Sequence, residues 1–359
     1  MGYSIGLIKE PIYETRIALL PDEIKKLKAQ YQVEVLLEKD YGTSVGISDE
    51  AFMGSGAVLQ PVEVILEKAD FILSINDVLS EELPIPPKAK FIGVFNALFF
   101  PERLQKYEKS EASVYSLDQL PRTTIAQTMD VRSSMDALSG YQSILKAAQL
   151  YGDIFPMMTT ASKTLQPVNV LVLGAGVAGL QAIATAKRLG AEVYAFDVRK
   201  AAGEEVRSLG AHFIEVEGST ESHNAGGYAV EQSSDYKKRQ EEEIKAKLAS
   251  TNIVICTANI PGKKAPLLLN EESLKCMPPN SVVIDLAAEQ GGNCSLTKNN
   301  ELTSFDSITI YGNSYLSREL PMAASKLLAA NFYNFLKYMI EKGESHELIS
   351  ACQVTFNLK

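Results

Sequence analysis

The sequence predicts an α/β protein with two parallel β-sheets, each covered by helices. Three observations support this prediction. Short apolar segments alternate with helical patterns along most of the chain, a glycine-rich turn joins a strand to a helix near residue 174, and 359 residues are too many for one ordinary hydrophobic core. We therefore expect two doubly wound, Rossmann-like domains, linked by long helices, with a cleft between them.

The first expected domain covers residues 1–130. Its five short apolar segments are expected to be strands, at 4–8, 33–37, 71–75, 91–94 and 114–116. Three intervening helical patterns, at 21–31, 61–69 and 101–112, each begin with a proline, which is favoured at the first helical position. A last long helical pattern, at about 320–341, is expected to return to this domain, so that residues 318–359 complete it.

The second expected domain covers residues 131–317 and begins with a linker helix at about 131–155. Its strands are expected at 168–173, 192–196, 212–216, 252–257, 281–286 and 307–311, with helices at 177–189 and 235–248. The polar stretch 217–234 is too long for an ordinary turn, which leaves two alternatives, a mobile functional loop or simple disorder.

The glycine-rich turn has the spacing of a dinucleotide-binding site. Gly174, Gly176 and Gly179 follow the apolar segment 168–173 in the pattern G-x-G-x-x-G. In that pattern the first glycine permits a tight turn, the second lets a pyrophosphate approach the backbone, and the third lets the helix pack closely on the strand. The helix that begins here directs its unpaired N–H groups and its positive dipole end at the phosphates. Because strand, turn and helix occur in the required order, we predict a dinucleotide site.

An acidic residue completes the pattern. Asp197 follows the next strand, about 20 residues after the glycines, where a carboxylate can accept hydrogen bonds from the adenosine ribose. Because a carboxylate repels a 2′-phosphate, Asp197 favours NAD over NADP. Arg199 is the counter-argument, since a guanidinium at that place could bind a 2′-phosphate. We expect NAD and keep NADP as the alternative.

Composition and charge exclude several function classes. The net charge of −9 argues against nucleic acid and anionic membrane surfaces as partners. No apolar run is long enough to cross a bilayer and the start lacks a signal-peptide pattern, so we expect an intracellular chain without a transmembrane segment. The four cysteines and three histidines are scattered without ligand spacing, so we expect no metal site.

A polar segment near the expected domain boundary, RTTIAQTMDVRSS at 122–134, has two interpretations. Arg122, Gln127 and Asp130 offer the donors and acceptors that a nicotinamide carboxamide requires. Alternatively, the segment is a solvated linker in which Asp130 caps the following helix. The spacing alone favours this second interpretation.

Two further polar groups also have two interpretations. Lys9, Glu10 and Arg16 follow the first strand, where they either bind an anionic substrate or, as the sequence alone favours, form a surface charge cluster. Glu289 and Asn293 either line the cleft or belong to an ordinary strand-to-loop exit.

No acid or base is convincingly placed for ordinary dehydrogenase chemistry. A dehydrogenase that acts on an alcohol, an amine or a keto acid moves a proton as well as a hydride, and it uses a placed acid or base, usually His or Lys. Hydride transfer between two nicotinamide rings requires no such proton transfer. A site made of orienting hydrogen bonds therefore fits transfer from nicotinamide to nicotinamide, in which the protein mainly positions the rings.

Nearly the whole chain resembles the NAD(H)-binding component of proton-translocating NAD(P) transhydrogenases, in the alanine dehydrogenase/transhydrogenase superfamily. The most specific stretches are PRTTIAQTMD, YGDIFPMMTTAS, GAGVAGLQAIATAKRLGAEVYAFDVR, AGGYA, NIPGKKAP and VIDLAAEQGGNC. The resemblance implies that NAD(H) binds here and NADP(H) binds on a partner component. It also implies that hydride passes directly between the two nucleotides, coupled to proton translocation by a membrane domain.

The resemblance assigns roles to residues. It implies that a polar loop orients the nicotinamide, and we take its catalytic residues to be Arg122, Gln127, Asp130 and Ser133. The expected cofactor-binding residues belong to the glycine turn, the ribose site, a loop that closes on the nucleotide, and the end of the strand 252–257. They are Gly174, Ala175, Gly176, Val177, Gly179, Asp197, Val198, Arg199, Gly227, Tyr228, Thr257 and Ala258.

The resemblance also implies an assembly and a location. The family component is a homodimer that docks on the NADP(H)-binding component, which stands on the membrane domain. We therefore expect a soluble domain peripheral to a membrane, on the cytosolic face in bacteria or the matrix face in mitochondria.

A free-standing, alanine-type amino-acid dehydrogenase is the alternative within the same superfamily. Arg16 matches the arginine that binds the substrate carboxylate there, but the regions of the catalytic lysine and histidine read ILSINDVLSEEL and FIGVFNALFF, without either residue. A non-catalytic NAD(H)-binding module is a third hypothesis.

Val94, Met135 and Ala137 depart from the transhydrogenase pattern, which tends to have His at the first position and polar residues at the other two.

Overall fold

The computed structural model describes residues 2–79, 83–218, 233–260 and 262–355, and it divides into two compact units. Unit 1 comprises Met1–Met135 and Arg318–Lys359, and unit 2 comprises Asp136–Ser317. The expected boundary after residue 130 falls just before helix α4 (Val131–Tyr151), whereas the units separate inside that helix, after Met135.

Unit 1 is built on a sheet of six parallel strands. In spatial order they are β3 (Ala57–Leu59), β2 (Val33–Leu37), β1 (Tyr3–Leu7), β4 (Phe71–Leu73), β5 (Lys90–Gly93) and β6 (Ser113–Ser116). The order reverses between β1 and β4, which is the topological switch point of a doubly wound sheet. The sequence predicted each of these strands except β3, whose three residues are too few to show a pattern.

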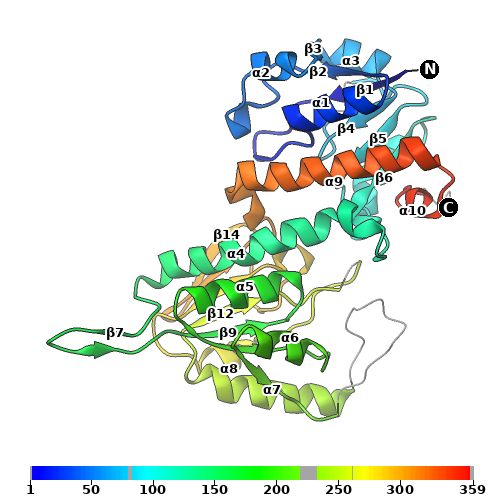
Figure 1. Ribbon diagram of the computed structural model, residues 1–359. Helices are drawn as coiled ribbons and strands as arrows, with labels where there is room; N and C mark the ends of the chain where they lie inside the picture. Colours follow the sequence, from blue (N-terminus) through cyan, green and yellow to red (C-terminus); the bar gives the residue numbers. More distant parts are fainter. Residues whose placement is uncertain (1, 80–82, 219–232, 261, 356–359) are drawn as a thin grey trace. The chain divides into compact units, whose positions relative to one another are not determined.

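Helices cover both faces of this sheet (Figure 1). Val35 and Leu37 of β2 lie in one core with helices α1 (Pro21–Gln30) and α9 (Pro321–Lys342), while Leu36 between them lies in a second core with α3 (Val62–Lys68). Burial on both faces explains why most residues of these strands are apolar. The short helices α2 (Asp49–Gly54) and α10 (Glu347–Ser350) complete the described α-helices of the unit.

The helix predicted over 101–112 was wrong. This segment forms a 3-10 helix, η2 (Pro101–Tyr107), whose buried residues are Leu104 and Tyr107. A spacing of three is the period of a 3-10 helix. In an α-helix over 101–112, the buried face would continue with further apolar residues one to two turns after Tyr107. At these positions the sequence has Glu111 and Ala112, so it supplies only one small apolar side chain. Other 3-10 turns are η1 (Thr43–Val45), η3 (Leu117–Gln119), η4 (Ala126–Met129), η5 (Ala288–Gln290) and η6 (Leu316–Glu319).

Unit 2 is built on a seven-stranded sheet. Its spatial order is β11 (His212–Ile214), β10 (Glu192–Phe196), β9 (Asn169–Leu173), β12 (Ile253–Cys256), β13 (Val282–Asp285), β15 (Ile308–Gly312) and β14 (Glu301–Phe305). Within this described sheet, the edge strand β14 pairs antiparallel and the others pair in parallel. The sequence did not indicate β14, because an edge strand exposed along most of its length lacks the apolar run of a central one. The switch point lies between β9 and β12.

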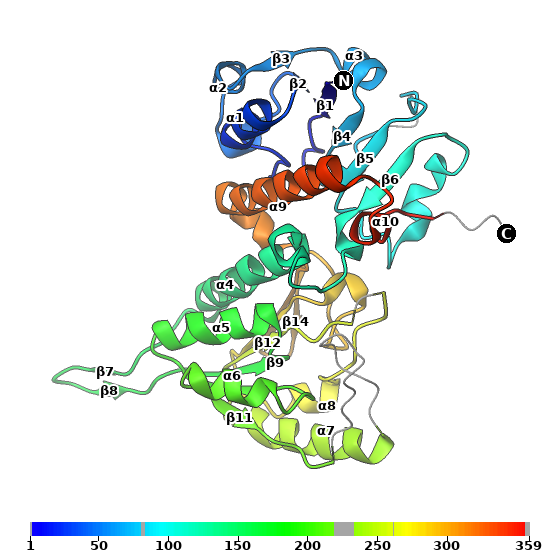
Figure 2. The same cartoon turned by 45° about the vertical axis from the view of Figure 1, so that its right-hand side comes forward.

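Helices also cover both faces of the second sheet (Figure 2). Helices α4, α5 (Val177–Arg188) and α6 (Ala202–Ser208) share one core with the strands, and α7 (Ser234–Leu248) and α8 (Glu271–Leu274) share the other. A hairpin of β7 (Met158–Thr159) and β8 (Thr164–Leu165) extends from the unit in both views. The predicted class, α/β with two parallel sheets, is confirmed. Among the described residues, no helix has the length and apolar character needed to cross a bilayer.

Candidate functional site

The glycine turn lies at the switch point of the unit 2 sheet, between the end of β9 and the start of α5. Gly174 has a φ of +103°, which only glycine adopts readily. A Cβ there would lie 2.7 Å from the Thr257 hydroxyl oxygen, and that hydroxyl donates a 2.7 Å hydrogen bond to the Gly174 carbonyl. The first glycine is therefore required both by its backbone conformation and by its contact with the end of β12.

The other two glycines have opposite surroundings. A Cβ on Gly179 would lie 1.9 Å from the Gly174 carbonyl oxygen, so only glycine lets α5 approach β9 this closely. A Cβ on Gly176 would meet no described atom within 4 Å. Gly176 is also the N-cap of α5, and no described side chain caps that helix. The N-terminus of α5 thus offers backbone N–H groups beside open space, as a phosphate site requires.

Asp197 joins the glycine turn to the end of β10. Its side chain is 7 % exposed, and its Oδ2 accepts the Ala175 N–H at 2.8 Å. Arg199 forms a bidentate pair with it, with Nε 2.9 Å from Oδ1 and Nη2 2.8 Å from Oδ2, and the Arg199 backbone N–H donates to Oδ1 at 2.9 Å. The hydrogen bond to Asp197 raises the pKa of Arg199. The sequence indicated both residues but not that they bind each other.

The neighbouring candidates differ in exposure. Ala175 is buried in the turn, and Val198 is half-buried against the core beneath α7. Val177, the first residue of α5, is exposed. Gly227 and Tyr228 lie outside the described residues.

A buried amide holds the end of β12 in place. Asn293 donates hydrogen bonds to the carbonyls of Ala258 and Pro266, both at 2.8 Å, and accepts the Ala258 N–H at 3.0 Å. The Asp285 carboxylate in turn accepts the Asn293 N–H at 2.7 Å, and burial raises the pKa of Asp285. Asn293 is fully buried, so it fixes Ala258 and belongs to the strand-to-loop exit. Its sequence position gave no signal of these long-range bonds.

Gly140 is a residue that sequence reasoning missed. A Cβ there would lie 2.1 Å from the Ala178 carbonyl oxygen, so α4 packs on the first turn of α5 at a distance that only glycine permits. A glycine inside a helical pattern was the available signal. Gly140 therefore helps to position the helix end that the glycine turn exposes.

The polar segment of unit 1 forms the 3-10 turn η4 directly before α4. The Thr128 carbonyl accepts side-chain hydrogen bonds from Asn331 at 2.9 Å and Asn334 at 3.0 Å, both on α9. The turn is therefore anchored through its backbone, while the side chains of Arg122 and Gln127 are exposed.

Asp130 caps α4. Its carboxylate accepts the Ser133 N–H at 2.9 Å and the Ser133 hydroxyl at 2.6 Å. The N-cap interpretation is confirmed for Asp130, and the structure brings two of the four nicotinamide candidates together. Met135 and Val94, where the chain departs from the transhydrogenase pattern, both pack against the core of unit 1.

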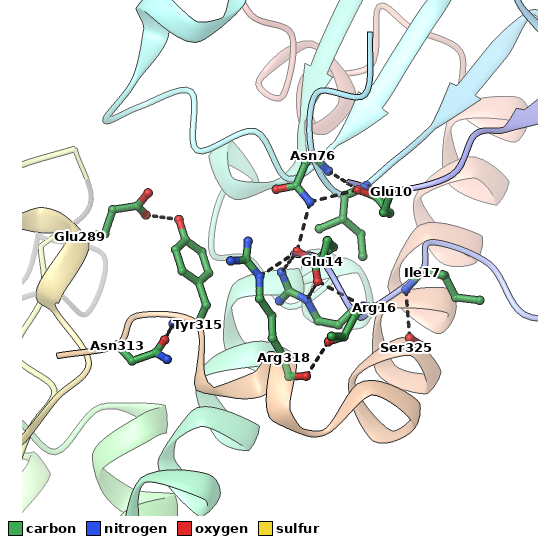
Figure 3. Close-up of polar contacts among 12 residues, drawn as sticks. Glu10, Glu14, Arg16, Ile17, Asn76, Glu289, Asn313, Tyr315, Arg318 and Ser325 are labelled. Carbon is green, nitrogen blue, oxygen red and sulfur yellow. Dashed lines mark hydrogen bonds and ion pairs between the residues drawn. The ribbon is translucent and has the colours of Figure 1, made fainter. Parts of the chain in front are cut away.

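A second polar cluster lies where β1 and β4 of unit 1 end (Figure 3). The Glu10 carboxylate accepts the backbone N–H of Ile75, and it accepts the backbone and side-chain N–H groups of Asn76 at 3.1 and 3.0 Å. Burial raises the pKa of Glu10 to about 7. Arg16 binds Glu14 through two hydrogen bonds, with Nε 2.6 Å from Oε1 and Nη2 2.8 Å from Oε2.

The sequence alone favoured a surface charge cluster of Lys9, Glu10 and Arg16, and this expectation is wrong for Glu10 and Arg16. Glu10 is 9 % exposed and Arg16 is 5 % exposed, and only Lys9 is on the surface. Glu14, a residue the sequence did not indicate, explains the difference because it binds both Arg16 and the Arg318 Nε at 2.9 Å. Burial by itself would raise the pKa of Glu14, but the hydrogen bond and charge of Arg16, with the charge of Arg318, lower it to about 2.

In unit 2, the Glu289 carboxylate also has a hydrogen-bond partner. Its carboxylate accepts a hydrogen bond from the Tyr315 hydroxyl, and the Tyr315 N–H donates to the Asn313 side chain at 2.7 Å. These residues follow β13 and β15 and appear together in Figure 3. Glu289 thus ties together two loops at the carboxyl ends of its sheet.

Comparison with known proteins adds to this geometry. Residues 6–139 match the family described as alanine dehydrogenase/PNT, N-terminal domain, and residues 143–355 match its C-terminal domain. The chain is 38 % identical over 348 residues to the first of the alpha-subunit chains of the NAD(P) transhydrogenase of Rickettsia prowazekii, covering 95 % of this chain and 91 % of the relative. It is also 38 % identical to the chain of the same name from Rhodospirillum rubrum over 338 residues, covering 92 % and 88 %. The crystal structure of a transhydrogenase from Sinorhizobium meliloti superposes with a TM-score of 0.88 at 35 % identity, covering 98 % of both chains.

Proposed function

Because the chain belongs to the alanine dehydrogenase/PNT family, we propose that it acts as the NAD(H)-binding component of a transhydrogenase. One observation supports nucleotide binding above all others. The glycine turn of unit 2 leads into a helix with open space at Gly176 and no described side-chain cap, and the next strand supplies Asp197 beside it. That combination fits a dinucleotide, with the pyrophosphate at the N-terminus of α5 and the adenosine ribose at Asp197.

The cofactor-binding residues then have separate tasks. Gly174 and Gly179 shape the turn, Ala175 holds the Asp197 carboxylate through its backbone N–H, and the backbone of Gly176 and Val177 meets the phosphates. Thr257 and Ala258 support the turn from the end of β12. We further propose that Val198 and Arg199 flank the ribose and that Gly227 and Tyr228 belong to a loop that closes on the nucleotide.

The nicotinamide ring of the bound nucleotide supplies the carbon that gives or takes the hydride, and the protein supplies orientation. We propose that Arg122, Gln127, Asp130 and Ser133 hold the carboxamide of that ring. The exposed side chain of Arg122 is a hydrogen-bond donor, and that of Gln127 is both donor and acceptor. Asp130 holds the Ser133 hydroxyl at 2.6 Å, which fixes the direction of both groups.

The acceptor is NADP⁺ on a separate NADP(H)-binding component, and a membrane domain couples the transfer to proton translocation. This step of the proposal rests on the resemblance of the chain to proton-translocating transhydrogenases, and its relatives are named as NAD(P) transhydrogenase chains. The chain would work as a homodimer peripheral to the membrane, on the cytosolic face in bacteria or the matrix face in mitochondria.

An alanine-type dehydrogenase remains the alternative within the family. A keto-acid substrate would need the Arg16 guanidinium for its carboxylate, and in unit 1 that guanidinium is bound by Glu14 through two hydrogen bonds. The geometry therefore favours the transhydrogenase component.

The test is hydride transfer from NADH to an NAD analogue, with a related NADP(H)-binding component and a trace of NADP(H) added. The control omits that component. We expect reduction of the analogue only with the partner present, and loss of this activity in Arg122→Ala, Gln127→Ala and Asp130→Ala. Turnover of alanine or pyruvate without a partner would instead establish the dehydrogenase, and NADH binding without transfer to a proven partner would indicate a binding module.

A further inference from the structure

Two side-chain amides of α9 hold the turn η4 at a single atom. The Asn331 Nδ2 donates a hydrogen bond to the Thr128 carbonyl oxygen at 2.9 Å, and the Asn334 Nδ2 donates to the same oxygen at 3.0 Å. The two asparagines are three residues apart, so they share one face of the helix. Thr128 lies between Gln127 and Asp130, two of the residues proposed to hold the nicotinamide carboxamide, and all of these residues belong to unit 1.

Apolar contacts hold the other side of the turn. Ala126 and Met129 are each 1 % exposed and lie in the same core as the buried side chains of α9. Burial of apolar surface has no preferred direction, whereas a hydrogen bond weakens steeply when its donor and acceptor are misaligned. The two buried side chains therefore keep the turn on the core, and the two amides set its orientation. That orientation decides where the exposed Gln127 side chain points.

The Asn331 amide is only partly satisfied. Asn331 is 5 % exposed, and its Oδ1 has no hydrogen-bond partner within the part of the chain that the structure describes. A buried acceptor without a donor destabilises a fold, whereas leucine has the same branched shape and no polar atom. The stability of α9 thus does not explain an asparagine at this position, and the carbonyl that Asn331 holds does.

We propose that Asn331 and Asn334 are positioning residues for hydride transfer, which fix the Thr128 carbonyl and through it the direction of Gln127 and Asp130. The inference rests on the proposed function, since it requires that this turn holds the carboxamide, and it adds two residues of α9 that act through the turn. Hydride transfer needs the reacting carbons in a near-attack geometry, and a misplacement of about 1 Å can cost about a hundredfold in rate. NADH affinity depends chiefly on the glycine turn of unit 2 in this proposal, so loss of the two amides should slow transfer more than it weakens binding.

The double variant N331L/N334A removes both donors to the Thr128 carbonyl. The matched control is Tyr333→Phe, which removes a different side-chain hydrogen bond of α9, the one that the Tyr333 hydroxyl donates to the Gln30 side chain at 2.7 Å. Melting temperatures and dissociation constants for NADH are measured on the full chain. The rate of hydride transfer is measured in a single turnover, from saturating NADH to an NADP⁺ analogue on the related NADP(H)-binding component.

The double variant should bind NADH with a loss of less than about threefold and should transfer hydride about tenfold to a hundredfold more slowly than the wild type. Asn331→Leu alone should slow transfer at a nearly unchanged melting temperature. It removes the unsatisfied acceptor together with the donor, and Asn334 still binds the carbonyl. Tyr333→Phe should transfer hydride at the wild-type rate.

Transfer at the wild-type rate in the double variant would overturn the proposal. An equal slowing in Tyr333→Phe, or a loss of NADH affinity as large as the loss of rate, would also overturn it. If the double variant does not fold, as judged by its melting curve, Asn334→Ala decides by the same criteria, because Asn334 is only half-buried and alanine is the most favourable residue in a helix. A wild-type chain that transfers no hydride with a proven partner would refute the proposed function and the positioning role with it. Wild-type transfer without slowing in the variants would refute only the positioning role.

Discussion

The two sheets of this protein have the same switch point in their strand order and opposite chemistry at it. In unit 1, the ends of β1 and β4 are joined by buried charges, with Glu10 on the backbone of residues 75 and 76 and Glu14 between Arg16 and Arg318. In unit 2, the end of β9 leads into a glycine turn with open space at Gly176 and no described side-chain cap on α5.

This difference shows that strand order alone does not leave backbone donors open at the edge of a sheet. Both sheets bring loops to the carboxyl ends of their strands, where doubly wound proteins bind ligands. In unit 1 Glu14 binds Arg16 and Arg318, and Glu10 binds the backbone of residues 75 and 76. In unit 2 no side chain of the described residues caps the backbone donors at the start of α5.

The largest expected effect concerns the edge of the unit 1 sheet where β1 and β4 end, which Glu10, Glu14 and their partners occupy and which we call the closed edge. Glu14→Gln removes the buried charge that neutralises Arg16, and breaking a buried ion pair costs about 3–5 kcal/mol. We expect a loss of that order in the free energy of unfolding, measured by urea denaturation. The matched control is Lys25→Gln, which removes an exposed ion pair with Asp22 and should change stability by less than about 1 kcal/mol. Equal effects of the two variants would show that the buried cluster does not hold the edge.

The same edge should respond to pH through Glu10. Its pKa is raised from 4.5 to about 7 in the folded chain, so its contribution to stability is complete below pH 4.5 and is lost as the pH rises through 7. We expect the free energy of unfolding to fall by up to about 3 kcal/mol between pH 5 and 8, and Glu10→Gln to remove this fall. Glu14 acts in the opposite sense and outside this window, because its pKa is lowered from 4.5 to about 2 and its contribution is lost only in acid. A fall that persists in Glu10→Gln would assign it to another group.

We call the edge of the unit 2 sheet where the glycine turn leaves open space at Gly176 the open edge. Stability and NADH binding there should both depend on Gly179. Gly179→Ala places a methyl group 1.9 Å from the Gly174 carbonyl oxygen, so α5 must shift away from β9. Overpacking of this kind costs about 1–3 kcal/mol. We expect a lower melting temperature together with weaker NADH binding. An unchanged melting temperature would mean that the helix does not depend on the close approach.

Gly176→Ala is the matched control for Gly179→Ala, because we expect it to weaken NADH binding without lowering stability. The added methyl group meets no described atom within 4 Å, and the φ of −78° suits alanine, so the melting temperature should not fall. The methyl group enters the space that the pyrophosphate needs, so NADH affinity should fall by about tenfold or more. Unchanged affinity, measured by fluorescence titration, would place the phosphates elsewhere.

The sequence predicted the open edge far better than the closed one. The glycine turn is local, because three glycines within six residues define its geometry, and Asp197 follows at a characteristic distance. The closed edge depends on contacts between distant residues, such as Glu14 with Arg318 and Glu10 with Asn76. No periodicity in the sequence encodes such pairs.

The same distinction explains the other differences. Strands β3 and β14 were missed because one is very short and the other is an exposed edge strand. The roles of Gly140 and Asn293 were missed because each acts on a backbone group far along the chain, Ala178 and Ala258. The bidentate pair of Asp197 with Arg199 is local in sequence, but its geometry is a matter of side-chain direction, which residue spacing does not fix.

The most direct test of this contrast is hydrogen exchange of the full chain with and without saturating NADH. Added protection is predicted at the first amides of α5, Val177 and Ala178, where the phosphates should bind. The amides of Ile75 and Asn76 should not change, because the Glu10 carboxylate already binds them. Protection at residues 75 and 76 without protection at the start of α5 would place the nucleotide at the edge of the first sheet and reverse the contrast between the two units.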